Sequence, residues 1–235
     1  MQIRGLGFKL LKSDMKSITI SLAFVAIFSI SARGQGFLNL NFESAQNLPG
    51  NPGNGQLIPV TNALPDWTAI GAVFSEVYYV SNILGHAGPG PELEGGSLAL
   101  SGNNLSVGLY DDSSISQTGL VPSTAESLQF EAQGPDPGNS LGGSDFAVSL
   151  GGQILPLSVL STGPNYNVYG ANIPAAMIGQ MEALRFGCQG PGSGGVLLDN
   201  IEFSPTVIPE PEMMALIASG GFLIAWRRLK MPFIR

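Results

Sequence analysis

Apolar and polar residues alternate through the middle of the chain, with the period of two that is typical of β-strands with one buried face. In DFAVSLGGQIL, residues 145–155, apolar side chains occupy every second position until Gly151 and Gly152. Paired glycines supply the positive φ angles of a two-residue hairpin turn. This stretch therefore predicts a β-hairpin that returns at Ile154.

The same alternation recurs between Gly- and Pro-rich turns. It predicts strands over 37–44, 73–80, 97–100, 105–110, 126–133, 165–169, 182–186 and 194–204. Many short strands at short intervals are typical of a two-sheet β-sandwich or jelly roll. We therefore expect an all-β domain over residues 35–204.

An apolar run near the start, residues 18–30, is too short to span a bilayer comfortably. Lysines precede it, and the small residues Ala32 and Gly34 follow it. This order is typical of a secretory signal peptide, whereas the alternative is a buried helix of the domain. We expect residues 1–34 to be removed by signal peptidase before Gln35.

A second apolar run, residues 213–226, corresponds to a helix of about 21 Å at ~1.5 Å per residue, against a hydrocarbon core of ~30 Å. Arg227, Arg228 and Lys230 form a basic cluster directly after it. Positive residues keep their flank of a membrane helix in the cytoplasm. We expect a single membrane helix with a basic tail over 213–235, and the preceding domain outside.

Residues 205–212 form a Pro-rich linker that contains Pro209, Glu210 and Pro211. A Pro-Glu-Pro motif, a short hydrophobic helix and a basic cluster, in this order, resemble the PEP-CTERM sorting signal of Gram-negative bacteria. The resemblance implies that an exosortase, a membrane protease, recognises the motif in a host that makes exopolysaccharide. It also implies transient anchoring in the inner membrane and delivery to the cell surface or extracellular matrix.

Charge is distributed very unevenly along the chain. Between residues 35 and 208, Arg185 is the one basic residue against fourteen Asp and Glu, a formal net charge of −13. A surface of this sign repels phosphate backbones, which excludes nucleic acid as a partner. Such an excess of carboxylates suits divalent cations or a hydrated polysaccharide, and plain solubility is the simpler explanation.

Three short motifs mark the domain: LNLNFESA near its start, LPDWT after that, and LLDNIEFS at its end. Together they resemble the galactose-binding-like jelly rolls found in many carbohydrate-binding modules. The resemblance implies that the first and last strands are neighbours and that a structural calcium ion lies near their junction. It also implies binding of polysaccharide.

Alternation within the last predicted strand places Asp199 on the face of Leu197 and Ile201, the apparent core side. An unsatisfied carboxylate is costly there. Backbone amides, a calcium ion shared with Glu43, and a β-bulge that turns the side chain outward are three solutions.

Trp67, Tyr78 and Tyr79 are candidates for a platform on which sugar rings stack. A core position is the alternative for Trp67. Because side chains alternate along a strand, one of the two tyrosines is expected to face outward.

Catalytic groups are few. His86 lies in a Gly- and Pro-rich loop with no nucleophile elbow nearby, and Cys188, the only cysteine, is expected to be a core residue without a disulfide. The acids available for a pair of the glycoside hydrolase type are Glu92, Glu94, Asp111 and Asp145. Asp111 and Asp112 suit either a solvated turn or a cation site.

We therefore expect an exported structural or adhesive protein that binds glycan in an exopolysaccharide layer and is not an enzyme. The alternative is a secreted carbohydrate-active enzyme that uses paired carboxylates.

Overall fold

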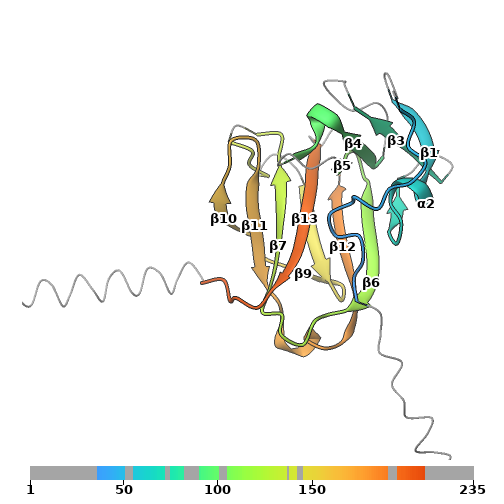
Figure 1. Cartoon of the computed structure of the whole chain (residues 1–235). Helices are drawn as coiled ribbons and strands as arrows, with labels where there is room; N and C mark the ends of the chain where they lie inside the picture. Colours follow the sequence, from blue (N-terminus) through green and yellow to red (C-terminus); the bar gives the residue numbers. More distant parts are fainter. Residues whose placement is uncertain are drawn as a thin grey trace, which may run out of the picture. The chain divides into compact units, whose positions relative to one another are not determined.

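The computed structural model describes residues 36–50, 55–71, 75–81, 90–100, 105–136, 138–141, 145–189 and 195–209. These residues form two β-sheets that pack against each other around a common core (Figure 1). The all-β sandwich predicted from the alternating pattern is confirmed.

Within the described ranges, the larger sheet has eight strands and the smaller sheet has five. Across the larger sheet the order is β1 (Gln56–Pro59), β3 (Glu76–Val80), β4 (Glu92–Gly95), β5 (Leu105–Leu109), β13 (Val196–Ser204), β7 (Ser127–Gln133), β11 (Asn167–Asn172) and β10 (Ser158–Thr162). Across the smaller sheet it is β2 (Thr68–Ile70), β6 (Ser114–Leu120), β12 (Met181–Gln189), β8 (Asp145–Leu150) and β9 (Gln153–Ile154). Short helical segments are α2 (Val60–Ala63), η1 (Gly96–Leu98) and η3 (Ala175–Met177). Among these strands, β3 and β4 run parallel and the other neighbouring pairs are antiparallel.

Large apolar side chains from both sheets meet in the core. Phe130 on β7 and Phe186 on β12 contact edge to face, with ring centroids 5.3 Å apart. Trp67 packs beside them, 6.3 Å from Phe186. Because the one cysteine, Cys188, is free, burial of this apolar surface is the main stabilising term of the fold.

The hairpin predicted around the paired glycines is confirmed. Gly151 and Gly152 have φ angles of 57° and 81°, and they join β8 to β9. A side chain at either position would be strained, because L-residues rarely adopt these angles.

The predicted first strand, 37–44, is wrong. Asn39 and Phe42 have positive φ angles of 47° and 59°, so the segment turns where a strand would continue. Gln117 on β6 holds it: the Leu38 amide donates to Gln117 Oε1 at 2.6 Å, and Gln117 Nε2 donates to the Leu38 carbonyl at 3.1 Å. The strand predicted over 97–100 is also wrong, because η1 (Gly96–Leu98) covers its first residues and no strand follows in this range.

The faces predicted for the last strand are wrong in its first half and hold for Ile201, which belongs to the core. Leu198 is the core residue in the first half, while Leu197 and Asp199 lie on the opposite face of β13, where Asp199 is nevertheless 0% exposed. A β-bulge between Asp199 and Glu202, with Asn200 at a φ of 46°, shifts the register of the second half of the strand. A period of two cannot anticipate such a bulge, since the extra residue reverses the alternation.

The signal peptide, the membrane helix and the basic tail fall outside the described residues, as do Glu210, Pro211 and His86. Pro209 is the last described residue, and it is exposed. Within the ranges that the structure describes, no helix has the length and apolar character needed to cross a membrane.

Candidate functional site

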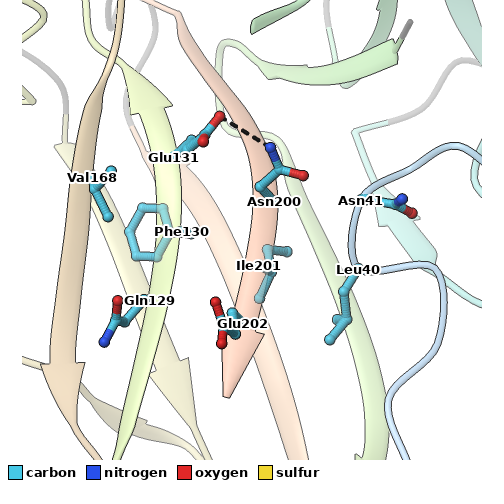
Figure 2. A pocket seen from close by; sticks show the side chains of 9 residues that line it. All are labelled: Leu40, Asn41, Gln129, Phe130, Glu131, Val168, Asn200, Ile201 and Glu202. Carbon is cyan, nitrogen blue, oxygen red and sulfur yellow. Dashed lines mark hydrogen bonds between the residues drawn. The ribbon is translucent and has the colours of Figure 1, made fainter. Parts of the chain in front are cut away.

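A groove on the outer face of the larger sheet gathers polar side chains from three parts of the chain (Figure 2). It encloses about 520 Å³, a volume within the range of small-ligand sites. Its lining residues are Leu40, Asn41, Gln129, Phe130, Glu131, Val168, Asn200, Ile201 and Glu202.

The β-bulge in β13 shapes this groove. Before the bulge, β5 pairs with β13 over Val196 to Leu198. After it, the amide of Ile201 donates to the carbonyl of Leu40 at 3.0 Å, so the N-terminal segment lies beside the second half of β13. The resemblance to jelly rolls implied that the first and last strands are neighbours. The predicted first strand is not a strand and β13 pairs with β5 and β7, but this hydrogen bond places Leu40 beside β13.

Five polar side chains line the groove, Asn41 from the N-terminal segment and four from β7 and β13. Asn200 Nδ2 donates to Glu131 Oε2 at 3.1 Å, the dashed line in Figure 2, and Gln129 Nε2 donates to Ser127 Oγ at 3.3 Å. Glu202 is exposed and lies opposite Gln129 on the neighbouring strand. Carboxylates accept hydrogen bonds and amides both donate and accept them, so this set matches the hydroxyl groups of a sugar.

Sequence reasoning missed these four residues. The one available signal was the alternation on β7, where Gln129 and Glu131 follow the buried Leu128 and Phe130 in turn. Alternation placed both side chains on the outer face, but it did not indicate which residues they would meet there.

The three aromatic candidates do not form a platform. Trp67 is only 5% exposed, and its Nε1 donates to the Asn39 carbonyl at 3.0 Å, so its ring belongs to the core. Tyr79 packs against the core from β3. Tyr78 lies on the opposite face of β3, opposite Glu92 on the neighbouring strand. The two tyrosines thus face opposite sides of the sheet.

Two of the candidate carboxylates share one face of β4. Glu92 and Glu94 are 0% and 5% exposed, and the Tyr110 hydroxyl donates to Glu94 Oε1 at 2.7 Å. Burial raises the pKa of Glu94 to about 7; the Tyr110 hydrogen bond lowers this pKa, and the neighbouring Glu92 raises it. Burial and the charge of Glu94 also raise the pKa of the Tyr110 hydroxyl.

The remaining chemical candidates lie elsewhere. Asp145 begins β8 in the smaller sheet. Asp111 and Asp112 form the turn between β5 and β6, with φ angles of 37° and 51°. Cys188 is buried in the core, and burial raises the pKa of its thiol to about 11. The thiol is therefore protonated at neutral pH and is a poor nucleophile.

The two calcium candidates each accept a backbone hydrogen bond. The Leu105 amide donates to Glu43 Oε1 at 3.0 Å, and the Asn200 amide donates to Asp199 Oδ1 at 2.7 Å. In the described ranges, no group of three or more His, Cys, Asp or Glu side chains is placed to hold a metal ion.

The outer face of the smaller sheet carries a second depression, of about 400 Å³. Arg185 on β12 is exposed within it, and its neighbours on the adjacent strands are Ser116 and Ser149. Much of the rest of the lining is alanine and glycine. This face therefore offers fewer converging polar groups than the groove on the larger sheet.

The fold and the groove thus define a β-sandwich with a polar site on the outer face of its larger sheet.

No family model matches the sequence, and no curated protein matches it. Solved structures that align with it include TmCBM61 in complex with β-1,4-galactotriose, with 15% identity over 71% of this chain and 95% of that chain and a TM-score of 0.36. Another is the Agl-KA catalytic domain, with 13% identity over 70% of this chain and 30% of that chain and a TM-score of 0.35. Scores of this size carry no inference about ligand or activity.

Proposed function

We propose that the chain is an exported glycan-binding protein of the cell surface or extracellular matrix, with a structural or adhesive role in a polysaccharide layer. The observation that carries this proposal is the groove beside the bulge in β13. There Gln129, Glu131, Asn200 and Glu202 present amide and carboxylate groups to one cavity.

A neutral glycan suits the groove best. Glu131 and Glu202 are acidic, and the domain around them carries a formal net charge of −13 between residues 35 and 208, so an anionic sugar is repelled. Hydroxyl groups of a neutral sugar can donate to both carboxylates. Leu40 and Val168 supply apolar surface for the C–H groups of the ring.

Affinity electrophoresis of the full chain tests the proposal. We expect native gels that contain a neutral polysaccharide to retard the chain, and the double variant Gln129→Ala, Glu202→Ala to migrate freely. Arg185→Gln, on the outer face of the other sheet, is the matched control and should be retarded like the unchanged chain. Retardation that the double variant keeps, or no retardation by any neutral polysaccharide, contradicts the proposal.

A secreted carbohydrate-active enzyme is the second candidate, favoured by the pKa of Glu94 near 7 beside a second carboxylate on the same strand. The burial of Glu92 and Glu94 favours binding over catalysis, because a substrate has to reach a catalytic acid. Release of reducing sugar from the same polysaccharides, abolished by Glu92→Gln or Glu94→Gln, would support the enzyme.

For export we propose removal of the signal peptide and recognition of the Pro-Glu-Pro motif by an exosortase. The sequence of the two ends supports this part of the proposal. Intact-mass analysis of the protein from its native host should give termini near Gln35 and near Pro209. A mass that includes both apolar end segments contradicts it.

A further inference from the structure

Exposed apolar side chains lie at one lateral edge of the sandwich, here called the β9–β10 end, which is formed by one edge strand of each sheet. β9 is the last strand of the smaller sheet. β10 is the last strand of the larger sheet, at the left of the sandwich in Figure 1. Ile154 on β9 is 69% exposed, and Val159 and Leu160 on β10 are 56% and 37% exposed. Leaving side chains of this size in water is unfavourable, and a cluster of them indicates a contact surface.

An apolar hollow of about 360 Å³ lies between the two strands. Its walls include Phe146 from β8, Leu157 from the link between the sheets, and Tyr169 from β11. Ile154 and Val159 line the same hollow. The end of the sandwich therefore offers both projecting apolar side chains and a recess that can receive them.

The charge distribution favours a second copy of this chain as the partner for this surface. Residues 146–181, which include β9, β10 and β11, contain no Asp, Glu, Lys or Arg, although residues 35–208 carry fourteen acidic side chains. Two copies of so acidic a domain repel each other when other faces meet, because those faces carry the carboxylates. At this end the strands β9 and β10 carry no charged side chain, and Arg185, which lines a depression together with Ile154, is basic, so two copies can meet here without setting acidic faces against each other. A basic partner, in contrast, would be attracted to the acidic faces.

We propose that the β9–β10 end, defined by the exposed Ile154 and Val159, the hollow that they line and the neighbouring Leu160, is a contact between two copies of this chain. A two-fold arrangement sets the same patch against itself, so each copy supplies both projections and recess. The register of β10 is broken between Val159 and Ser161. Because such a bulge blunts an edge strand, the contact is made by side chains and does not extend the sheet.

Disulfide trapping in the full chain tests the contact directly. Cys188 is 2% exposed and so gives little background crosslinking. Under mild oxidation we expect Val159→Cys to form a covalent dimer on a non-reducing gel. Met181→Cys, at a side chain that is 50% exposed on β12, is the matched control and should stay monomeric. Equal dimer yields at the two positions overturn the proposal.

Light scattering of the full chain in one fixed detergent gives a second test. We expect the full chain to be a dimer. The double variant Ile154→Asp, Val159→Asp should be a monomer, and Met181→Asp should remain a dimer.

Raising the ionic strength from about 0.01 M to 0.15 M should strengthen the dimer. The Debye length falls from about 30 Å to 8 Å, so the salt screens the repulsion between the acidic faces. A monomer at about 1 mM, or a dimer that the double variant retains, overturns the proposal. Unchanged circular dichroism establishes that each variant is folded.

Discussion

The hydroxyl of Tyr110 donates a hydrogen bond of 2.7 Å to Oε1 of Glu94, and both groups are withdrawn from solvent beside a second buried carboxylate, Glu92. This arrangement controls the protonation of Glu94. Below its pKa of about 7 the carboxyl group is neutral, and above it a charge resides in a poorly solvated position.

Stability should therefore fall as pH rises from 4.5, the ordinary pKa, to about 7. In this window the folded chain holds a proton on Glu94 that the unfolded chain has lost, so raising the pH favours unfolding. The contribution is on the order of 3 kcal/mol. Urea unfolding from pH 5 to pH 8 should give a free energy of unfolding that decreases with pH, and Glu94→Gln should remove most of this decrease.

Glu202→Gln, at an exposed carboxylate, is the control and should show the same decrease as the unchanged chain. An unchanged slope in Glu94→Gln contradicts the assignment.

Tyr110→Phe should destabilise the chain by about 2 kcal/mol at pH 8 and by about 1 kcal/mol at pH 5, because a hydrogen bond to a charged acceptor is the stronger one. It should also raise the pKa of Glu94 further, since this hydrogen bond lowers it. Urea unfolding at the two pH values measures the first effect, and NMR titration of the Glu94 carboxyl carbon measures the second. A lowered pKa of Glu94 in Tyr110→Phe, or an equal loss of unfolding free energy at both pH values, would contradict the prediction.

Gly108→Ala should disturb the hydrogen bond between Tyr110 and Glu94 by steric overlap with both side chains. A Cβ at this position would lie 2.6 Å from Tyr110 Cε2 and 2.7 Å from Glu94 Oε1, closer than real contacts. We expect a loss of about 1 to 3 kcal/mol in the free energy of unfolding. Gly50→Ala, where nothing lies within 4 Å of the added carbon, should cost little. Equal free energies of unfolding for the two variants would contradict the prediction, because they would show that the Tyr110 side chain can move away without loss of stability.

Chelation should leave the melting temperature unchanged. Glu43 and Asp199 each accept a backbone amide, and the described residues include no group of three or more His, Cys, Asp or Glu side chains placed to hold a metal ion. The measurement is a thermal melt with and without EDTA. A lower melting temperature that calcium restores and magnesium does not would contradict this expectation, and Asp199→Asn should then abolish the response.

The sequence predicted the features that depend on neighbouring residues. Alternation and the paired glycines were enough for the hairpin of β8 and β9, and alternation placed Leu128 and Phe130 in the core. β4 was missed because its charged side chains, Glu92 and Glu94, are buried, which is opposite to the usual pattern.

The groove could not be predicted, because it depends on one local irregularity that alternation does not reveal and on one contact between distant segments. The bulge at Asn200 reverses the alternation of β13 within one strand. The hydrogen bond from Ile201 to Leu40 then brings together segments that are separated by most of the domain. Trp67 shows the same limit, since no local pattern separates a core ring from one that meets a sugar.

Isothermal titration of a neutral oligosaccharide, cut from the polysaccharide that retards the chain, tests glycan binding in the groove most directly. The account predicts that Gln129→Ala weakens binding at least about tenfold, or ~1.4 kcal/mol, while Arg185→Gln leaves the affinity unchanged. Equal affinity of Gln129→Ala and the unchanged chain, or a loss confined to Arg185→Gln, would contradict it.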